Sequence, residues 1–252
     1  MSLRFGKLPP KIDNRTLELG KYLGTQLATP PVSFDVLEKI SKRFDNIDVT
    51  GWFPMDGNDK LKNCTVVAVA HAITIFRGLT GVRYIAPEKA VIDLYYSLTN
   101  GVNSDLTMLD VLKHWRKQAV FGDKIFAYTK IDARNHTHVA QAIQLFGCIY
   151  AGFKVSANTI KEFQAQETWT PERLTQEGSN GEGHAVIVTA YDPRVLTILT
   201  WGSVQKATWE WWDEHVDEVY VTLPPEAKET NFSQGFNFVQ LEKDLELIGL
   251  QS

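Results

Sequence analysis

The chain contains 252 residues and carries a formal net charge of −4, and 44% of its residues are hydrophobic. This length and apolar content suit one compact unit with two halves rather than several domains. Lys and Arg are scattered among Asp and Glu without a basic run, and no apolar stretch is long enough to span a bilayer, so we expect neither nucleic acid nor a membrane as a partner.

Residues 1–50 predict an extended N-terminal arm. Pro9-Pro10 and Pro30-Pro31 punctuate short apolar groups, which favours extended segments, with a short helix near residues 34–44. The start of the arm lacks the continuous apolar core of a secretory signal, so we expect a cytoplasmic location. We also expect the arm to brace the protein's own surface or a neighbour's and to leave Cys64 accessible.

Residues 51–120 predict a helical half. The run from Cys64 to Phe76 is apolar nearly all round and is followed by Gly78, which is typical of a buried central helix and its end. After Pro87, apolar residues recur at three- and four-residue spacing, so further helices are expected in this half.

Residues 121–222 predict a sheet half, interrupted by one helix over residues 138–146. Its β-branched and aromatic runs are short and are bounded by Gly, Pro, Asp or Asn, which favours strands of an antiparallel sheet or open barrel. A helical half followed by a sheet half is an α+β arrangement with a cleft at the seam. The expected strands lie within residues 124–131, 147–155, 184–191, 195–202 and 218–223.

Residues 223–252 form a C-terminal tail. Leu241, Leu245 and Ile248 share one face of a short predicted helix, and Gly249 is a natural stop. The tail and the arm are therefore predicted to serve assembly or bracing rather than chemistry.

The two cysteines lie far apart in apolar surroundings, so we expect reduced thiols and no disulfide. Cys64 opens the central helix directly after Asn63, a favoured N-cap residue. A helix N-terminus and an imidazolium partner stabilise a thiolate, which makes Cys64 a candidate nucleophile. The alternative is that Cys64 is a small buried hydrophobe. Cys148 lies mid-strand and is expected to be core.

His184 is the candidate base, because it opens a predicted strand after a glycine-rich stretch and so stands on a rigid element. An ordinary polar contact at a strand edge is the alternative. His71 is expected to be a satisfied core residue of the central helix. His136 and His138 lack a third ligand at a recognisable spacing and indicate a helix start, so we expect no metal and no other cofactor.

Five features together resemble the papain family of cysteine proteases. They are Asn58, Cys64 six residues after it, His184 at a strand start, Tyr191 in that strand, and the pair Trp201-Gly202. The resemblance spans roughly residues 52–222 and implies a papain-like catalytic-type domain over residues 51–222. It also implies that Asn58 donates to an oxyanion, as the family's glutamine does, and that Trp201 keeps water off the base.

The sequence departs from the papain pattern at the third catalytic position. The family has an Asn two residues before the tryptophan, where this chain has Leu199, and aligning the preceding loop without a gap puts Thr200 there. A Thr hydroxyl orients an imidazole weakly, and Asp192 in the adjoining turn is a further candidate for that role. Thr65 replaces the tryptophan that follows the nucleophile in the family.

Four motifs resemble small papain-like proteins of unknown role from tailed phages and prophages. These motifs are GKLPP, GNDKLKNC, GEGHAV and LTWG. The resemblance implies a virion-associated location as the alternative to a cytoplasmic one, with other virion proteins as partners.

Three functions are open from the sequence. The first is a cysteine peptidase or thiol acyl hydrolase acting on a peptide or amide substrate. The second is a catalytically weak or inactive papain-like fold that serves as a phage virion or interaction protein. The third is a cell-wall amide hydrolase, which also places Cys at a helix start and His at a strand start.

Overall fold

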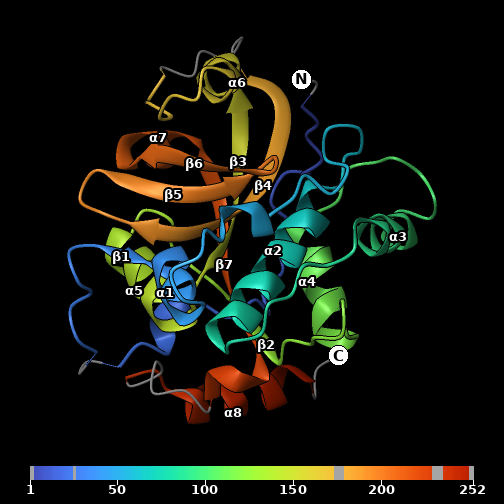
Figure 1. Ribbon diagram of the computed structural model, residues 1–252. Coiled ribbons are helices and arrows are strands. Elements are labelled where there is room, and N and C mark those ends of the chain that lie inside the picture. Colours follow the sequence, from blue (N-terminus) through green and yellow to red (C-terminus); the bar gives the residue numbers. More distant parts are fainter. Residues whose placement is uncertain (1–2, 25–26, 173–178, 229–234, 250–252) are drawn as a thin grey trace.

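The computed structural model describes residues 3–24, 27–172, 179–228 and 235–249. It confirms the α+β class, with a group of helices facing an antiparallel sheet (Figure 1). The helices are α1 (Val36–Arg43), α2 (Cys64–Leu79), α3 (Glu88–Leu98), α4 (Met108–Lys117), α5 (His136–Phe146), α6 (Ala157–Gln164), α7 (Trp209–His215) and α8 (Phe238–Gly249). Short 3-10 turns are η1 (Leu19–Lys21), η2 (Thr50–Trp52) and η3 (Pro225–Lys228).

The sheet has the strand order β2-β7-β3-β4-β5-β6, with the short β1 paired to β4. All of its pairings are antiparallel. The strands are β1 (Phe34–Asp35), β2 (Ala127–Lys130), β3 (Ile149–Ser156), β4 (Ser179–Tyr191), β5 (Val195–Thr200), β6 (Ser203–Thr208) and β7 (Val216–Leu223). β3 lies at the centre and is buried at nearly every position, which explains its continuous apolar run.

The central helix α2 is buried on nearly all sides, as its apolar sequence predicts. It lies between the sheet on one side and α3 and α4 on the other (Figure 1). The Tyr150 hydroxyl on β3 donates to the Thr65 carbonyl at 2.9 Å, which ties the first turn of α2 to the middle of the sheet. The N-terminal end of α2 therefore faces the seam between the two halves.

Several elements agree with the sequence analysis and others were missed. The helices α1, α5 and α8 overlap the predicted segments, and the Thr208 side chain caps α7, as a Thr at an N-cap favours. α6 and β6 lie outside the predicted segments. Within the residues that the structure describes, no helix is long and apolar enough to cross a membrane.

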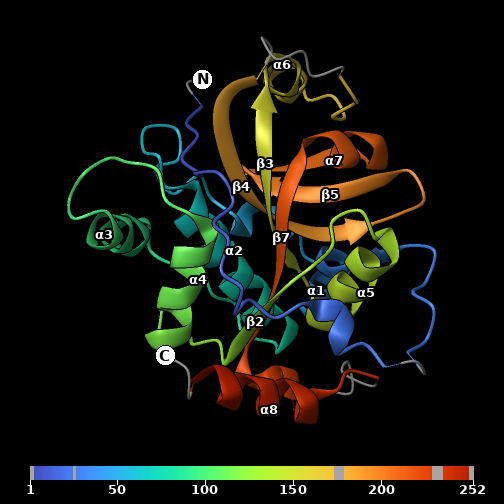
Figure 2. The same cartoon turned by 180° about the vertical axis from the view of Figure 1, so that it is seen from behind.

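The first described residues of the arm run between the two halves rather than over an outer surface. Figure 2 shows this dark-blue segment passing between α4 and α2 on one side and β4 and β7 on the other. Lys7 pairs in parallel with Leu106 of the helical half and antiparallel with Gly183 of the sheet half. The arm thus bridges the seam in which the candidate site lies.

Candidate functional site

A tight turn places Asn58 ahead of α2. The Asn58 N–H donates to the Met55 carbonyl at 3.0 Å, and Asp56 and Gly57 between them have φ values of 49° and 78°. Positive φ at both central positions is the geometry of a type I′ turn, for which Asp-Gly is a preferred pair. The sequence therefore fixes the backbone that leads from Asn58 to Cys64 at the start of the helix.

Asn63 precedes α2 in the N-cap position but does not cap it. Its side chain makes no hydrogen bond to the helix, and its Nδ2 instead donates to the Asp56 carbonyl at 2.8 Å. The expectation from residue type is thus corrected, because the Asn63 amide joins the helix start to the preceding turn. This bond holds the Asn58 turn against the N-terminus of α2.

The sheet brings His184 beside Cys64. His184 lies opposite Phe153 on β3, and the N–H of the next residue, Ala185, lies close enough to Cys64 to lower the pKa of its thiol. The His184 Nε2 lies 2.8 Å from the Thr200 Oγ1, while its Nδ1 is buried without a hydrogen-bond partner among the described residues. The strand begins at residue 179, so His184 lies within β4 and not at its start, contrary to the prediction.

Trp201 covers the His184 ring. The two rings are stacked, with centroids 4.1 Å apart and planes 19° from parallel. Trp201 and Gly202 have φ values of 45° and 69° between the paired residues Thr200 and Ser203, so they occupy the centre of a two-residue hairpin turn. A tryptophan in the left-handed region is uncommon, and here that conformation places the indole over the imidazole.

Of the three candidates for the third catalytic position, Leu199, Thr200 and Asp192, Thr200 is the one whose side chain contacts His184. The Asp192 carboxylate accepts from the N–H groups of Arg194 and Val195, at 2.7 and 2.9 Å, and so closes its own turn. Leu199 is buried in the core and has no polar group to offer. Alternation along β5 turns neighbouring residues to opposite faces, which separates Leu199 from Thr200.

The arm fills the space over Cys64 and His184. The Arg4 carbonyl accepts from the Asn58 Nδ2 at 3.5 Å and from the Trp201 Nε1 at 3.3 Å. Phe5 approaches the His184 ring edge-on, at 6.1 Å between centroids. The Gly6 N–H donates to the Gly183 carbonyl at 3.2 Å and acts on the Cys64 thiol closely enough to lower its pKa.

Backbone hydrogen bonds tie the arm to both walls of the cleft. The N–H groups of Gly6 and Lys7 donate to the Gly183 carbonyl at 3.2 and 3.0 Å. On the other wall, Leu8 donates to the Leu106 carbonyl and Leu106 donates to the Gly6 carbonyl, each at 2.9 Å. The arm is therefore held on both sides of Cys64.

Two glycines allow this close approach. A Cβ on Gly6 would lie 2.0 Å from the Lys62 carbonyl oxygen, and a Cβ on Gly183 would lie 2.5 Å from the Lys7 carbonyl oxygen. Both distances are far below contact distance and involve backbone atoms, which yield less readily than side-chain ends. The arm fits in the cleft because no side chain stands at either position.

Burial by the arm changes the ionisation of the pair. Cys64 is only 1% exposed, and burial raises its thiol pKa to about 11, against the smaller lowering effects of the Ala185 and Gly6 N–H groups. Burial also lowers the pKa of His184 to about 3. The expectations of an accessible Cys64 and of a lowered thiol pKa are therefore wrong for this closed arrangement, in which both groups are neutral at pH 7.

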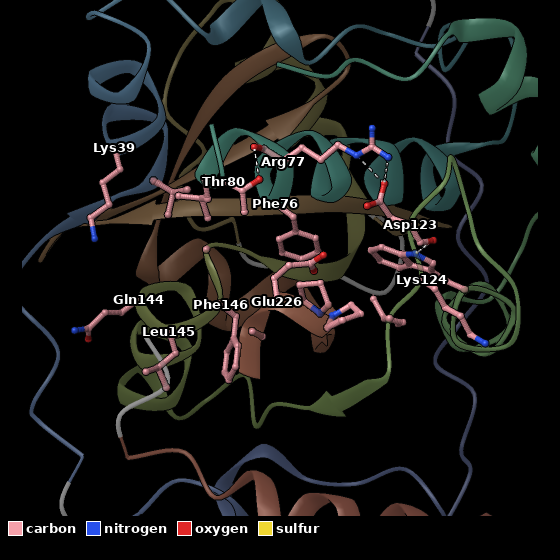
Figure 3. A pocket seen from close by; sticks show the side chains of 18 of the residues that line it. Lys39, Phe76, Arg77, Thr80, Asp123, Lys124, Gln144, Leu145, Phe146 and Glu226 are labelled. Atoms are coloured by element: carbon pink, nitrogen blue, oxygen red, sulfur yellow. Dashed lines mark hydrogen bonds and ion pairs between the residues drawn. The ribbon is translucent and has the colours of Figure 1, made fainter. Parts of the chain in front are cut away.

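A separate cavity of about 270 Å³ lies toward the other end of α2, about 20 Å along the helix axis from Cys64. Figure 3 shows Phe76 from α2 and Phe146 from α5 projecting into it, with the ion pair of Arg77 and Asp123 at one side. Its lining contains neither Cys nor His. The cavity therefore offers no pair of nucleophile and base.

No family model matches the sequence, and no curated protein matches it. Solved structures do match. Xylellain, a cysteine protease from Xylella fastidiosa, is 15% identical with a TM-score of 0.67, over 88% of this chain and 96% of its own. ProCathepsin B S9 from Trypanosoma congolense is 12% identical with a TM-score of 0.55, over 88% of this chain and 86% of its own.

A third match is the Carica candamarcensis cysteine protease CMS1MS2, solved in complex with E-64. It is 13% identical with a TM-score of 0.53, over 77% of this chain and 98% of its own. These likenesses show that the chain has the papain-like fold, which agrees with the resemblance read from its motifs. They also place it among the folds of cysteine proteases, whereas the resemblance to phage proteins stays a prediction.

Sequence reasoning missed the part of the site that the arm supplies. Gly6 and Lys7 lie in the GKLPP motif, which carried a resemblance but no role. The acidic partners of Lys7 are Asp217 and Glu218 at the start of β7. Glu218 was read only as part of a strand, and Asp217 lay just outside the predicted strand. Two successive acidic residues entering an otherwise buried strand are the one signal that pointed to this feature.

Proposed function

We propose that the chain is a cysteine peptidase or related thiol acyl hydrolase in which Cys64 is the nucleophile and His184 the general base and acid. The observation that carries the proposal is the position of Cys64 at the N-terminus of α2, where the N–H of Ala185, the residue after His184, lowers the pKa of the thiol. The His184 Nε2 is in turn hydrogen-bonded to Thr200. A helix N-terminus and a neighbouring imidazole are the two features that turn a thiol into a nucleophile. The site requires no cofactor in this proposal.

In the open cleft, the proton of Cys64 passes to the Nδ1 of His184, which has no other partner among the described residues. The thiolate attacks the substrate carbonyl carbon, and the resulting oxyanion receives hydrogen bonds from Asn58 Nδ2 and the Cys64 N–H. His184 then protonates the leaving amine, and a thioester remains on Cys64. Water, deprotonated by His184, attacks the thioester and releases the acid, which restores the thiol.

The arm also supports the proposal, because it lies where a bound substrate would have to lie. The Asn58 Nδ2, which would serve the oxyanion, donates to the Leu61 carbonyl at 3.1 Å and, at 3.5 Å, to the Arg4 carbonyl of the arm. Phe5 and Gly6 lie beside His184 and Cys64. We therefore propose that residues 3–8 hold the peptidase closed, with residues 51–222 as the catalytic domain. The bracing role expected for the arm becomes an inhibitory one in this proposal.

The substitution Gly6→Ala tests both the nucleophile and the closure. Its methyl group has no room in the closed cleft, and a forced clash of this kind costs about 1–3 kcal/mol. If that cost falls on the closed state alone, alkylation of Cys64 by iodoacetamide rises roughly 5- to 150-fold. Peptide mapping by mass spectrometry gives the rate at Cys64, with buried Cys148 as the internal unlabelled reference.

Gly51→Ala is the matched control, because a Cβ there meets nothing within 4 Å and its φ is not positive. It should leave the alkylation rate unchanged. Hydrolysis of a mixed fluorogenic peptide pool should appear in Gly6→Ala and vanish when Cys64→Ala is added. A Gly6→Ala protein that alkylates quickly yet hydrolyses nothing would contradict the peptidase proposal.

A second candidate is a catalytically silent binding protein, and the closed cleft is the observation that favours it. Thr200 in place of an amide at the third position points the same way, since a hydroxyl orients the imidazole with one weaker contact. This candidate predicts that Cys64 in Gly6→Ala reacts no faster than an ordinary thiol at pH 6, where a free Cys with a pKa near 8.5 is almost wholly protonated.

A further inference from the structure

The arm carries one buried cation across the cleft. The Lys7 side chain is 1% exposed, and its Nζ lies 2.9 Å from Asp217 Oδ1 and 3.0 Å from Glu218 Oε1. Removing an ammonium from water costs several kcal/mol unless its partners are well placed. The Lys7 Nζ donates hydrogen bonds to Asp217 Oδ2 at 3.1 Å and to the Leu8 carbonyl at 3.2 Å, and Glu218 adds an ion-pair contact.

The shape of this pocket depends on a missing side chain. A Cβ on Gly152 of β3 would lie 2.0 Å from the Lys7 Cε and 2.6 Å from the Met108 Sδ of α4. The Lys7 stem therefore runs through the space that Gly152 leaves open, between the sheet half and the helical half. The pocket opens from the cleft one residue along the arm from Gly6, which faces Cys64.

The floor of the pocket is prepared for a cation independently of the arm. The Tyr220 hydroxyl donates to Glu218 Oε2 at 3.0 Å and so leaves Oε1 for Lys7. Asp217 and Glu218 together carry two negative charges against the single charge of Lys7. Both carboxylates belong to β7, so they stay in place when the arm leaves, whereas the Leu8 carbonyl departs with it.

Building on the proposed function, we infer that this acidic pocket is a specificity subsite that selects a Lys or Arg side chain of the substrate, and that Lys7 occupies it in the closed protein. Two adjacent carboxylates in a largely buried site attract a cationic side chain and repel an acidic one. An uncharged aliphatic side chain would fill the space that the methylene groups of Lys7 occupy, but it would leave the two carboxylates without a cationic partner. The substrate class is therefore basic peptides.

The pocket can be tested without catalysis by chemical rescue. Lys7→Ala removes the equivalent of a propylammonium ion, so added n-propylammonium should raise the melting temperature of this variant more than that of the wild type. n-Propanol, of the same length without the charge, should show no such difference. Equal effects of the two reagents, or equal effects on the two proteins, would overturn the cation pocket.

The specificity is tested in the Gly6→Ala full-length protein, which keeps Lys7 and so does not depend on the folding of Lys7→Ala. The probes are peptidyl acyloxymethyl ketones of matched length. In each probe, one of three positions on the acyl side of the ketone carries Lys, norleucine or Glu. At one position, the Lys probe should label Cys64 at least about 10-fold faster than the norleucine probe, with Glu slowest. Adding Asp217→Asn should reduce this preference.

The two proposals fail in different ways. If Gly6→Ala hydrolyses the peptide pool but the Lys and norleucine probes label Cys64 equally at every position, the subsite is overturned and the proposed function stands. If no electrophile labels Cys64, the proposed function fails, and the propylammonium rescue still decides whether the pocket binds a basic group.

Discussion

At the scale of single residues, the proposed chemistry depends most on the contact between His184 and Thr200. Thr200 is buried, and its Oγ1 is the hydrogen-bond partner of the His184 Nε2. The partner of one ring nitrogen fixes the tautomer and tilt of the imidazole, and thereby the direction in which the other nitrogen faces the thiol. Thr200 is thus a positioning residue in the proposed mechanism.

We expect Thr200→Val, in the Gly6→Ala background, to lower peptide hydrolysis on the order of 10-fold and to change its pH profile. The substitution preserves shape but leaves the buried Nε2 unpaired, which also costs about 1–3 kcal/mol of folding free energy. Thr200→Asn, which supplies an amide, should restore the pH profile. Thr197→Val on the same strand is the control, and equal effects of the two valine variants would show that Thr200 has no special role.

The residues that sequence reasoning placed at the site are those joined by short motifs. Asn58 and Cys64 are six residues apart, and a tight turn and a helix start follow directly from their neighbours. The choice between Leu199 and Thr200 needed the structure, because a shift of one residue reverses the face of a strand. The contact between Lys7 and Asp217 joins residues 210 positions apart, which no local pattern specifies.

At the scale of elements, the side-chain amide of Asn63 could serve either as the N-cap of α2 or as a link from α2 to the preceding turn, and a substitution distinguishes the two roles. If Asn63 were a conventional N-cap, Asn63→Asp would be nearly neutral, since Asp and Asn cap about equally well. Because its Nδ2 donates to the Asp56 carbonyl, the carboxylate instead loses a donor and faces an acceptor. We expect a loss of about 1–3 kcal/mol in unfolding free energy, measured by urea denaturation.

Asn135→Asp provides the comparison for this prediction. The Asn135 Oδ1 accepts from the His138 N–H at 3.1 Å and so caps α5 in the conventional way. Its replacement by Asp should change the unfolding free energy by less than about 0.5 kcal/mol. Equal losses at the two positions would show that the Asn63 side chain acts as an ordinary cap.

The long elements with clear periodicity were predictable, whereas the missed ones lacked a pattern. α2 and β3 are buried on nearly all sides and have continuous apolar runs of helix and strand length. β6 has the sequence SVQKAT with alternate exposure, and its apolar content is too low to stand out. α6 follows β3 without a break, and only its N-cap Ser156 marks the change.

At the scale of the whole molecule, the balance between closed and open cleft should depend on pH. In the closed form His184 is neutral, because burial lowers its pKa to about 3, whereas an exposed imidazole has a pKa near 6.5. The open form therefore binds a proton below about pH 6.5 that the closed form does not bind until about pH 3. Closure is thus strongest above pH 6.5 and is lost progressively as the pH falls toward 3.

Hydrogen exchange of residues 3–8 in Cys64→Ala measures this balance, because removing the thiol leaves His184 to titrate alone. Between pH 7 and 5.5, the opening constant, corrected for intrinsic exchange, should rise roughly 8-fold if the open imidazole has its ordinary pKa. Lys7, Asp217 and Glu218 also carry charge beside the arm. Whatever part of the pH dependence comes from these three groups remains in the double variant Cys64→Ala/His184→Gln, which lacks the imidazole. In the double variant, most of the increase in the opening constant between pH 7 and 5.5 should therefore disappear. An increase equal to that of Cys64→Ala would assign the pH dependence to the acidic pocket instead of His184.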